Sequence, residues 1–247
     1  MRLMDRSFLL VLIVTIALLG LVEAQFHIGR RLTGTHALGQ RELATQFLGQ
    51  HLAQHFPGYQ VVVWSNPFSR ASGQPREVYQ FEKAGLRGLH RGLGTAVTIE
   101  AVVFPELRPE CRQNLSSVYI DPATTTPLSY LVAPGALDAM VNEHPGARII
   151  VSLIGLPVNL RQTRTWTTAS GKSFALLLPD LRMVGNQADI RQALQSGQIA
   201  AVVLNKPGAP PEDLPLGRDL KMEFDQRFLL VTAENADSVL KAFPRLF

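Results

Sequence analysis

Short, continuously apolar segments recur along this chain, and segments with helical periodicity stand between most of them. The six segments expected as strands lie at residues 59–65, 96–104, 147–155, 173–179, 199–205 and 227–233. They are apolar throughout, which is typical of strands whose two faces are both covered by helices in a parallel sheet. The order of the segments therefore predicts an α/β protein of three layers, with a mainly parallel sheet and helices on both faces.

Amphipathic patterns predict the helices that cover this sheet. The expected helices lie at residues 41–56, 76–94, 135–144, 186–198 and 235–243. The Pro- and Thr-rich stretch 105–127 and the Pro-rich stretch 207–215 are expected as loops. We expect one α/β domain over residues 41–247, and two reduced lobes, 41–155 and 173–247, are the alternative.

The first 24 residues have the three parts of a secretory signal. Arg2 and Arg6 precede the apolar run 8–21, and Ala24 is a small residue at the expected cleavage point. Cleavage there predicts a periplasmic or secreted protein that begins with a lead-in linker at 25–40. The alternative is an uncleaved anchor in the inner membrane, formed by residues 8–22, because a run this long is short for a membrane span but not excluded as one.

Charge and cysteine content exclude two broad classes of protein. The formal net charge is +4, and no run of five or more Lys or Arg residues is present, so the sequence shows no nucleic-acid footprint. Cys111 is the only cysteine, so an exported form has no internal disulfide and depends on its apolar core. We interpret Cys111 as a bystander thiol, because no partner for it is evident.

Motifs for metal binding or catalysis are incomplete in this chain. "HLAQH" at 51–55 has two histidines at metal-ligand spacing but lacks the glutamate of the metalloprotease motif, and "ASGKS" at 169–173 lacks the first glycine of a phosphate-binding loop. No G-x-S-x-G elbow is present. We therefore expect no metal, no cofactor and no catalytic residue, while enzymatic activity stays open.

Candidate ligand-binding residues follow directly from the strands, because ligands of open parallel sheets bind beyond the carboxyl ends of the strands. The candidates are Ser65, Asn66, Phe68, Glu106, Asp180, Asn205 and Lys206. Asn66 and Asn205 each follow an apolar strand and precede a proline, so one hypothesis places both at a common crevice. The alternative is that each is a turn residue that bonds its own backbone.

Three stretches resemble type I periplasmic solute-binding proteins. They are "EKAGLRGLHRGLGTAVTIEAVVF", "GALDAMVNEHPGARIIVSLIGLP" and "ADIRQALQSGQIAAVVLNKPG", and the resemblance covers about residues 59–206. It implies a non-enzymatic protein that binds a small solute or a partner protein. The chain departs from the family in being shorter than two full lobes require and in carrying the insertion 105–127. The alternatives are an exported hydrolase-like enzyme using Asp180, Glu106 or Ser65, and a membrane-anchored assembly protein.

Overall fold

The computed structural model describes residues 36–114, 117–168 and 170–247. The predicted signal or anchor, and the part of the predicted linker before residue 36, lie outside these ranges. Within the described ranges, no helix combines the length and the apolar character that a membrane span requires.

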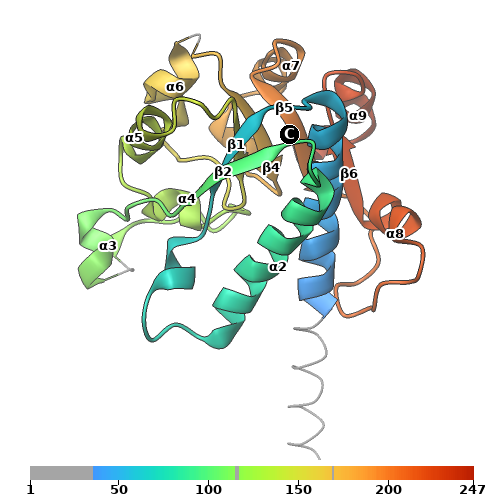
Figure 1. Cartoon of the computed structure of the whole chain (residues 1–247), viewed down its shortest axis with the longest axis horizontal. Coiled ribbons are helices and arrows are strands. Elements are labelled where there is room, and N and C mark those ends of the chain that lie inside the picture. Colours follow the sequence, from blue (N-terminus) through green and yellow to red (C-terminus); the bar gives the residue numbers. More distant parts are fainter. Residues whose placement is uncertain (1–35, 115–116, 169) are drawn as a thin grey trace, which may run out of the picture.

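A single six-stranded sheet forms the centre of the molecule (Figure 1). Its strands are β1 (Gln60–Trp64), β2 (Thr98–Val103), β3 (Ile149–Ser152), β4 (Ser173–Leu177), β5 (Ile199–Asn205) and β6 (Phe228–Val231). They lie in the order β2-β1-β3-β4-β5-β6, and only the β5–β6 pair is antiparallel. The predicted class, a mainly parallel sheet within an α/β fold, is confirmed.

Helices cover both faces of this sheet. One face carries the N-terminal helix (36–55), α2 (Arg76–Leu93) and α8 (Leu220–Arg227), and the other carries α5 (Ala136–Glu143), α6 (Arg164–Thr167), α7 (Gln187–Gln195) and α9 (Ala236–Ala242). Along β1 the side chains alternate between the two cores, Val61 and Val63 on one face, Val62 and Trp64 on the other. Each strand is thus buried from both sides, which explains its continuously apolar sequence.

Glycines of α2 bring the N-terminal helix unusually close. A Cβ added to Gly88 would lie 2.0 Å from the carbonyl oxygen of Glu42, and one added to Gly92 would lie 2.1 Å from that of Gln46. Only residues without a Cβ permit this separation of the two backbones. The glycines that "GLRGLHRGLG" spaces along α2 therefore form the contact surface for the preceding helix.

The segment after β2 folds over the edge of the sheet at which β1 to β5 end, here called the carboxyl edge. It contains the short helices α3 (Pro109–Gln113) and α4 (Leu128–Leu131), which lie together at one side of this edge (Figure 1). Ser129 Oγ donates to the carbonyl of Ile154, 3.2 Å away, just beyond β3. The stretch expected as a loop therefore packs onto the sheet through its own short helices.

Three features differ from the sequence-based expectation. The N-terminal helix is already helical at residue 36 and not only from 41, because Gln40 and Gly39 contact the loop before α8. Helix α8 was not expected at all. Strand β6 runs antiparallel, so Glu234, which follows it, lies at the opposite, amino edge of the sheet. The 3₁₀ turns that lie wholly within the described ranges are η1 (Pro67–Arg70), η3 (Leu160–Gln162), η4 (Leu181–Met183) and η5 (Pro244–Leu246).

Candidate functional site at the carboxyl edge

The strand order defines where a ligand site is expected. The chain passes from β1 to β2 on one side and then crosses to β3 on the other side of β1. The direction in which strands are added to the sheet therefore reverses between β1 and β3, which remain parallel. In open α/β sheets the crevice beyond the carboxyl ends at this switch point is the usual binding place. The residues after β1 and after β3 are therefore the first to consider.

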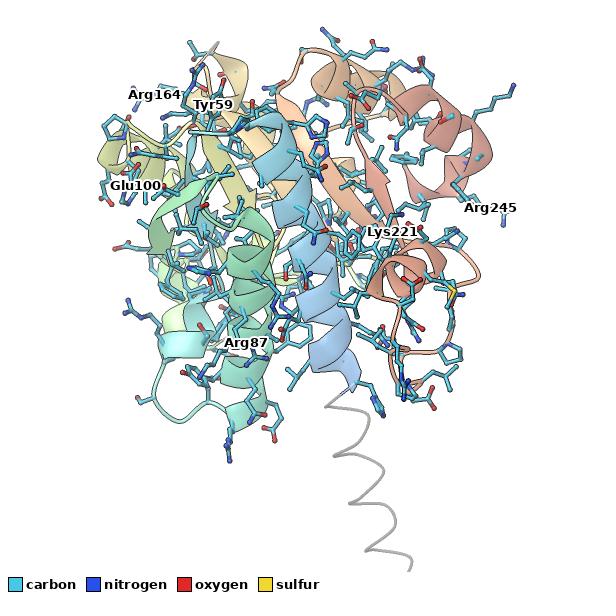
Figure 2. The ribbon with its side chains drawn as sticks, turned by 45° about the vertical axis from the view of Figure 1, so that its right-hand side comes forward. Tyr59, Arg87, Glu100, Arg164, Lys221 and Arg245 are labelled. Atoms are coloured by element: carbon cyan, nitrogen blue, oxygen red, sulfur yellow. The ribbon has the colours of Figure 1, made fainter. Side chains whose placement is uncertain are left out.

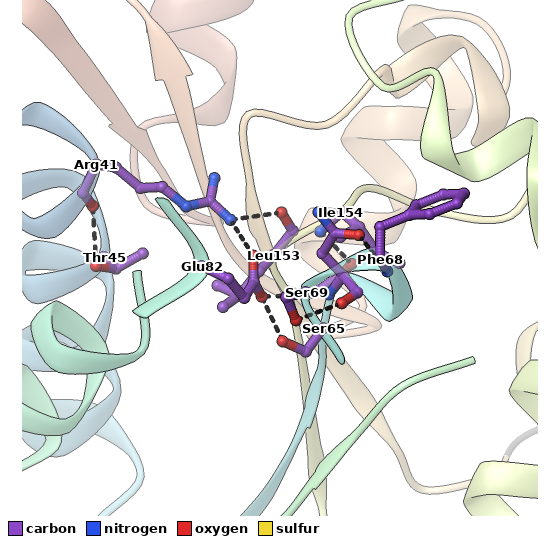
Figure 3. A network of polar contacts seen from close by, with 10 residues as sticks. Arg41, Thr45, Ser65, Phe68, Ser69, Glu82, Leu153 and Ile154 are labelled. Atoms are coloured by element: carbon purple, nitrogen blue, oxygen red, sulfur yellow. Dashed lines mark hydrogen bonds and ion pairs between the residues drawn. The ribbon is translucent and has the colours of Figure 1, made fainter. Parts of the chain in front are cut away.

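Glu82 lies at the centre of a buried polar network at this switch point (Figure 3). Ser65 Oγ donates to Glu82 Oε1, and the backbone N–H of Asn66 donates to the same oxygen at 3.2 Å. Arg41 Nη2 lies 3.1 Å from Glu82 Oε2 and 3.2 Å from the carbonyl oxygen of Leu153. One carboxylate thus joins the exit of β1 to α2, and one guanidinium joins α2 to the exit of β3.

Arg41 is held in place by more than its charge. Its guanidinium stacks on the Phe81 ring at 4.3 Å, and its Nε lies where a side chain on Gly85 would be. That Nε has no hydrogen-bond partner among the described residues. Burial lowers the pKa of Arg41, and the charge and hydrogen bond of Glu82 oppose this effect. The pair is buried and charged, so each partner depends on the other.

Asn66 begins η1 directly above this network. Its Oδ1 accepts the N–H of Phe68 at 2.9 Å, which is the turn interaction that the sequence offered as the alternative. The described part of the chain offers its Nδ2 no hydrogen-bond partner, and both Asn66 and Phe68 are half-buried. The carboxyl end of β1 therefore presents an amide donor whose orientation is fixed, with the half-buried Phe68 two residues further along.

The other candidates beyond β2 and β4 take part in separate contacts. Glu106 is exposed, and its carbonyl accepts the N–H of Ala133. Asp180 is buried and accepts Thr124 Oγ1 at 2.8 Å together with three bonds from Arg182. Burial alone would raise the pKa of Asp180, but the hydrogen bonds from Arg182 and Thr124 lower it overall.

Asn205 and Lys206 lie at the far end of the same edge. Asn205 ends β5 opposite Phe228, and Lys206 Nζ donates to the carbonyl of Asp225 at 2.7 Å. Strands β3 and β4 stand between β1 and β5, so three spacings of about 4.8 Å, about 14 Å in all, separate Asn205 from Asn66. The structure brings Ser65, Asn66 and Phe68 together and leaves the remaining candidates apart.

Two important residues were missed by the sequence analysis. Neither Arg41 nor Glu82 follows a strand, and each looks like an ordinary charged residue of an amphipathic helix. The only available signal was that Glu82 lies between Phe81 and Lys83 at a position that the helical period of α2 turns toward the sheet, next to the buried Ala84 and Gly85.

The amino edge holds a cavity. This cavity, of about 250 Å³, is lined by His90, Leu93, Gly94, Thr95, Val97, Thr98 and Ile99, where α2 leads into β2. Its lining is polar and apolar in similar parts, and His90 is the one titratable side chain among the lining residues. Within the described ranges, no group of three or more His, Cys, Asp or Glu residues is placed to hold a metal ion, at this cavity or elsewhere.

The histidines of "HLAQH" stack on each other with ring centroids 4.1 Å apart. Burial, with the neighbouring charge of His55, lowers the pKa of His51 to about 4. His51 is therefore a neutral, packed residue at neutral pH. Cys111 is buried, and burial raises the pKa of its thiol, which makes it a poor nucleophile.

No protein-family model matches the chain, and no curated protein matches its sequence. Solved structures that match include a solute-binding protein from Burkholderia graminis in complex with D-arabinose, at 12% identity and a TM-score of 0.45 over 80% of this chain. A carbohydrate transporter protein from Acidothermus cellulolyticus in complex with myo-inositol matches at 12% identity and 0.43 over 83% of the chain. A complex of the TorS sensor domain with TorT, without ligand, matches at 11% identity and 0.39 over 67%.

The chain spans 61%, 62% and 45% of these three structures, respectively. At this level the likeness concerns the arrangement of sheet and helices, and it transfers no ligand and no binding residue. Two of these three structures are solute-binding or carbohydrate transporter proteins, the class to which the sequence analysis drew its resemblance.

Proposed function

We propose that this protein is an exported, non-enzymatic binding protein that takes a small neutral, hydroxyl-bearing solute at the carboxyl end of β1. The solute lies over η1, where Phe68 supplies an apolar face and Asn66 Nδ2 donates a hydrogen bond. An amide suits hydroxyl groups, and it adds no charge to the site.

The observation that supports this most is the fixed geometry of η1 at the switch point. The Asn66 backbone is bonded to Glu82, its Oδ1 is bonded to Phe68, and its Nδ2 is left for a ligand. A donor that is already ordered loses little entropy when it binds. The buried pair of Arg41 and Glu82 beneath it serves as a rigid support.

Catalysis at the same residues is disfavoured by their contacts. Ser65 is fully buried beneath η1, so a substrate cannot reach its hydroxyl oxygen, and its hydroxyl group donates a hydrogen bond to Glu82. Asp180 is bound on both oxygens by Arg182 and Thr124. These are structural networks, and a hydrolase using them would first have to break them.

The test is calorimetric titration of the purified protein with pentoses, hexoses and cyclic polyols, D-arabinose and myo-inositol included. Asn66→Ser keeps an oxygen to cap η1 but removes the amide donor, so it should weaken binding by about 1–3 kcal/mol without unfolding the domain. Asn205→Ser is the matched control, because it removes the same group about 14 Å away along the edge.

Binding that Asn66→Ser leaves unchanged would contradict the proposal, as would a solute that is equally weakened by Asn205→Ser. Turnover of an ester or glycoside that Ser65→Ala abolishes would favour the hydrolase instead.

A further inference from the structure

Six large apolar side chains are exposed in the described part of the chain. They are Tyr79, Phe81, Tyr119, Leu214, Leu220 and Met222. Five of them, all except Tyr119, belong to the first turns of α2 or to α8 and the loop before it. We call these five the α2–α8 flank. Exposed apolar side chains gathered on one part of a surface commonly mark an interaction site.

The α2–α8 flank borders the point at which residues 1–35 join the domain. Phe81 packs on Arg41, Gln40 Nε2 donates to the carbonyl of Glu212 at 3.0 Å, and a Cβ on Gly39 would lie 3.4 Å from Leu216. The N-terminal helix therefore begins between α2 and the loop before α8. Figure 1 shows α2 and α8 on opposite sides of this helix, and Figure 2 shows the same for Arg87 of α2 and Lys221 of α8.

We propose that the α2–α8 flank rests on a lipid bilayer in the full chain, with the apolar run 8–21 retained as the anchor. Fourteen residues, 22–35, connect that run to residue 36 and span about 50 Å even when fully extended. A tether of this length keeps the flank at high effective concentration next to the membrane. The first surface of the domain to reach the bilayer is the one around residue 36.

The chemistry of the flank fits the interfacial zone of a bilayer. Tyrosine and other aromatic side chains favour the level of the lipid headgroups. The exposed charges around the flank nearly balance, with Arg76, Lys83, Arg218 and Lys221 against Glu77, Glu212, Asp213, Asp219 and Asp225. Contact is therefore driven by apolar burial and needs no anionic lipid.

This inference does not rest on the solute site. In both views η1 lies on the side of α2 away from α8, so the α8 part of the flank, which carries the probe position Met222, is separate from η1 (Figures 1 and 2). The two proposals can therefore fail independently.

The experiment uses the full chain in phosphatidylcholine nanodiscs at one copy per disc. Cys111 is buried and is removed as Cys111→Ala, and an environment-sensitive fluorophore is attached through Met222→Cys. Tyr119→Cys is the matched control, because Tyr119 is the most exposed of the six apolar residues, at 79%, and lies outside the flank. Lipids with a quencher at the headgroup report contact.

We expect lipid quenching at position 222 and little at position 119, and a reduction at 222 when Tyr79→Ser and Phe81→Ser are added. Equal, low quenching at both positions would overturn the proposal. The proposal would also be overturned if the fluorophore were shielded from water only in discs that hold two copies and were not quenched by lipid, because this result indicates self-association of the protein. A protein recovered from cells with its N-terminus at Gln25 would overturn it as well.

Discussion

Two buried Arg–Glu pairs lie at separate places along the carboxyl edge, one at the switch point between β1 and β3 and one in α8 beside β6, and they are built differently. Arg41 and Glu82 come from separate helices and connect the exits of β1 and β3. Arg227 and Glu223 are one turn apart within α8, and the guanidinium also donates to the carbonyls of Pro210, Pro211 and Leu214. The first pair fixes tertiary structure at the candidate site, and the second folds a proline-rich loop.

The two pairs differ in the hydrogen-bond acceptors that the arginine keeps when its glutamate is removed. Arg227 keeps three backbone carbonyls as acceptors, whereas Arg41 keeps only Leu153 and already has an Nε without a partner in the described structure. A buried charge without compensation is costly. The pair at the candidate site is therefore the more fragile one, although the two have similar burial.

Glu82→Gln should be the most damaging of the changes considered. It leaves the Arg41 guanidinium buried and unpaired, so we expect a loss of about 3–5 kcal/mol in the free energy of unfolding, measured by urea denaturation. Arg41→Met combined with Glu82→Leu should restore much of the loss, because no buried charge is then left alone. If Glu82→Gln alone were as stable as the wild type, the Arg41–Glu82 pair would not be important to the free energy of unfolding.

Glu223→Gln should cost less, about 1.5–3 kcal/mol in the same assay, because Arg227 keeps its carbonyl partners. Hydrogen bonds from Arg227 and from the backbone of Gly217 hold the pKa of Glu223 below its ordinary value of 4.5. Its contribution is therefore present above pH 4.5 and is lost as the pH falls through the lower folded value. The variant should lose that part of the acid sensitivity, and an unchanged pH profile would contradict this.

Gly88→Ala should affect the first pair and spare the second. The added Cβ would meet backbone and side-chain atoms of Glu42 and Thr45, which must separate the N-terminal helix from α2. Overpacking of this kind costs about 1–3 kcal/mol. Hydrogen exchange should speed up in both helices and stay unchanged in α8, and faster exchange in α8 would break the distinction.

Arg91→Ala should have the smallest effect. Arg91 pairs with Glu42 across the same two helices, but its side chain is 59% exposed. Surface pairs contribute about 0–1 kcal/mol, so stability should change within that range. A loss as large as that of Glu82→Gln would mean that burial is not what separates the strong pairs from the weak ones.

The sheet and most of its covering helices were predictable because their signals are local. Continuous apolar segments such as 199–205 indicated strands buried on both faces, and the Asn66 turn could be expected from a residue that bonds its own backbone. Helix α8 was not predictable from the sequence, because most of its side chains face solvent and only Glu223, Phe224 and Arg227 are buried. Its position depends on the loop it anchors.

The core of the candidate site was beyond prediction for a different reason. Arg41 and Glu82 are 41 residues apart, and their contact exists only because the glycines of α2 let two helices approach closely. Neither partner carries a local signal for such a contact. Ser65 and Asn66 were predictable because they follow a strand directly, but Glu82, which accepts their hydrogen bonds, and its partner Arg41 do not follow a strand.

The most direct test of the account is to map, by amide chemical shifts, where a solute binds on the protein. We expect a bound sugar or polyol to shift the resonances of residues 65–70 and 153–155 around the Arg41–Glu82 pair, and we expect Asn66→Ser to reduce those shifts. Shifts confined to His90–Ile99 at the amino-edge cavity would contradict it.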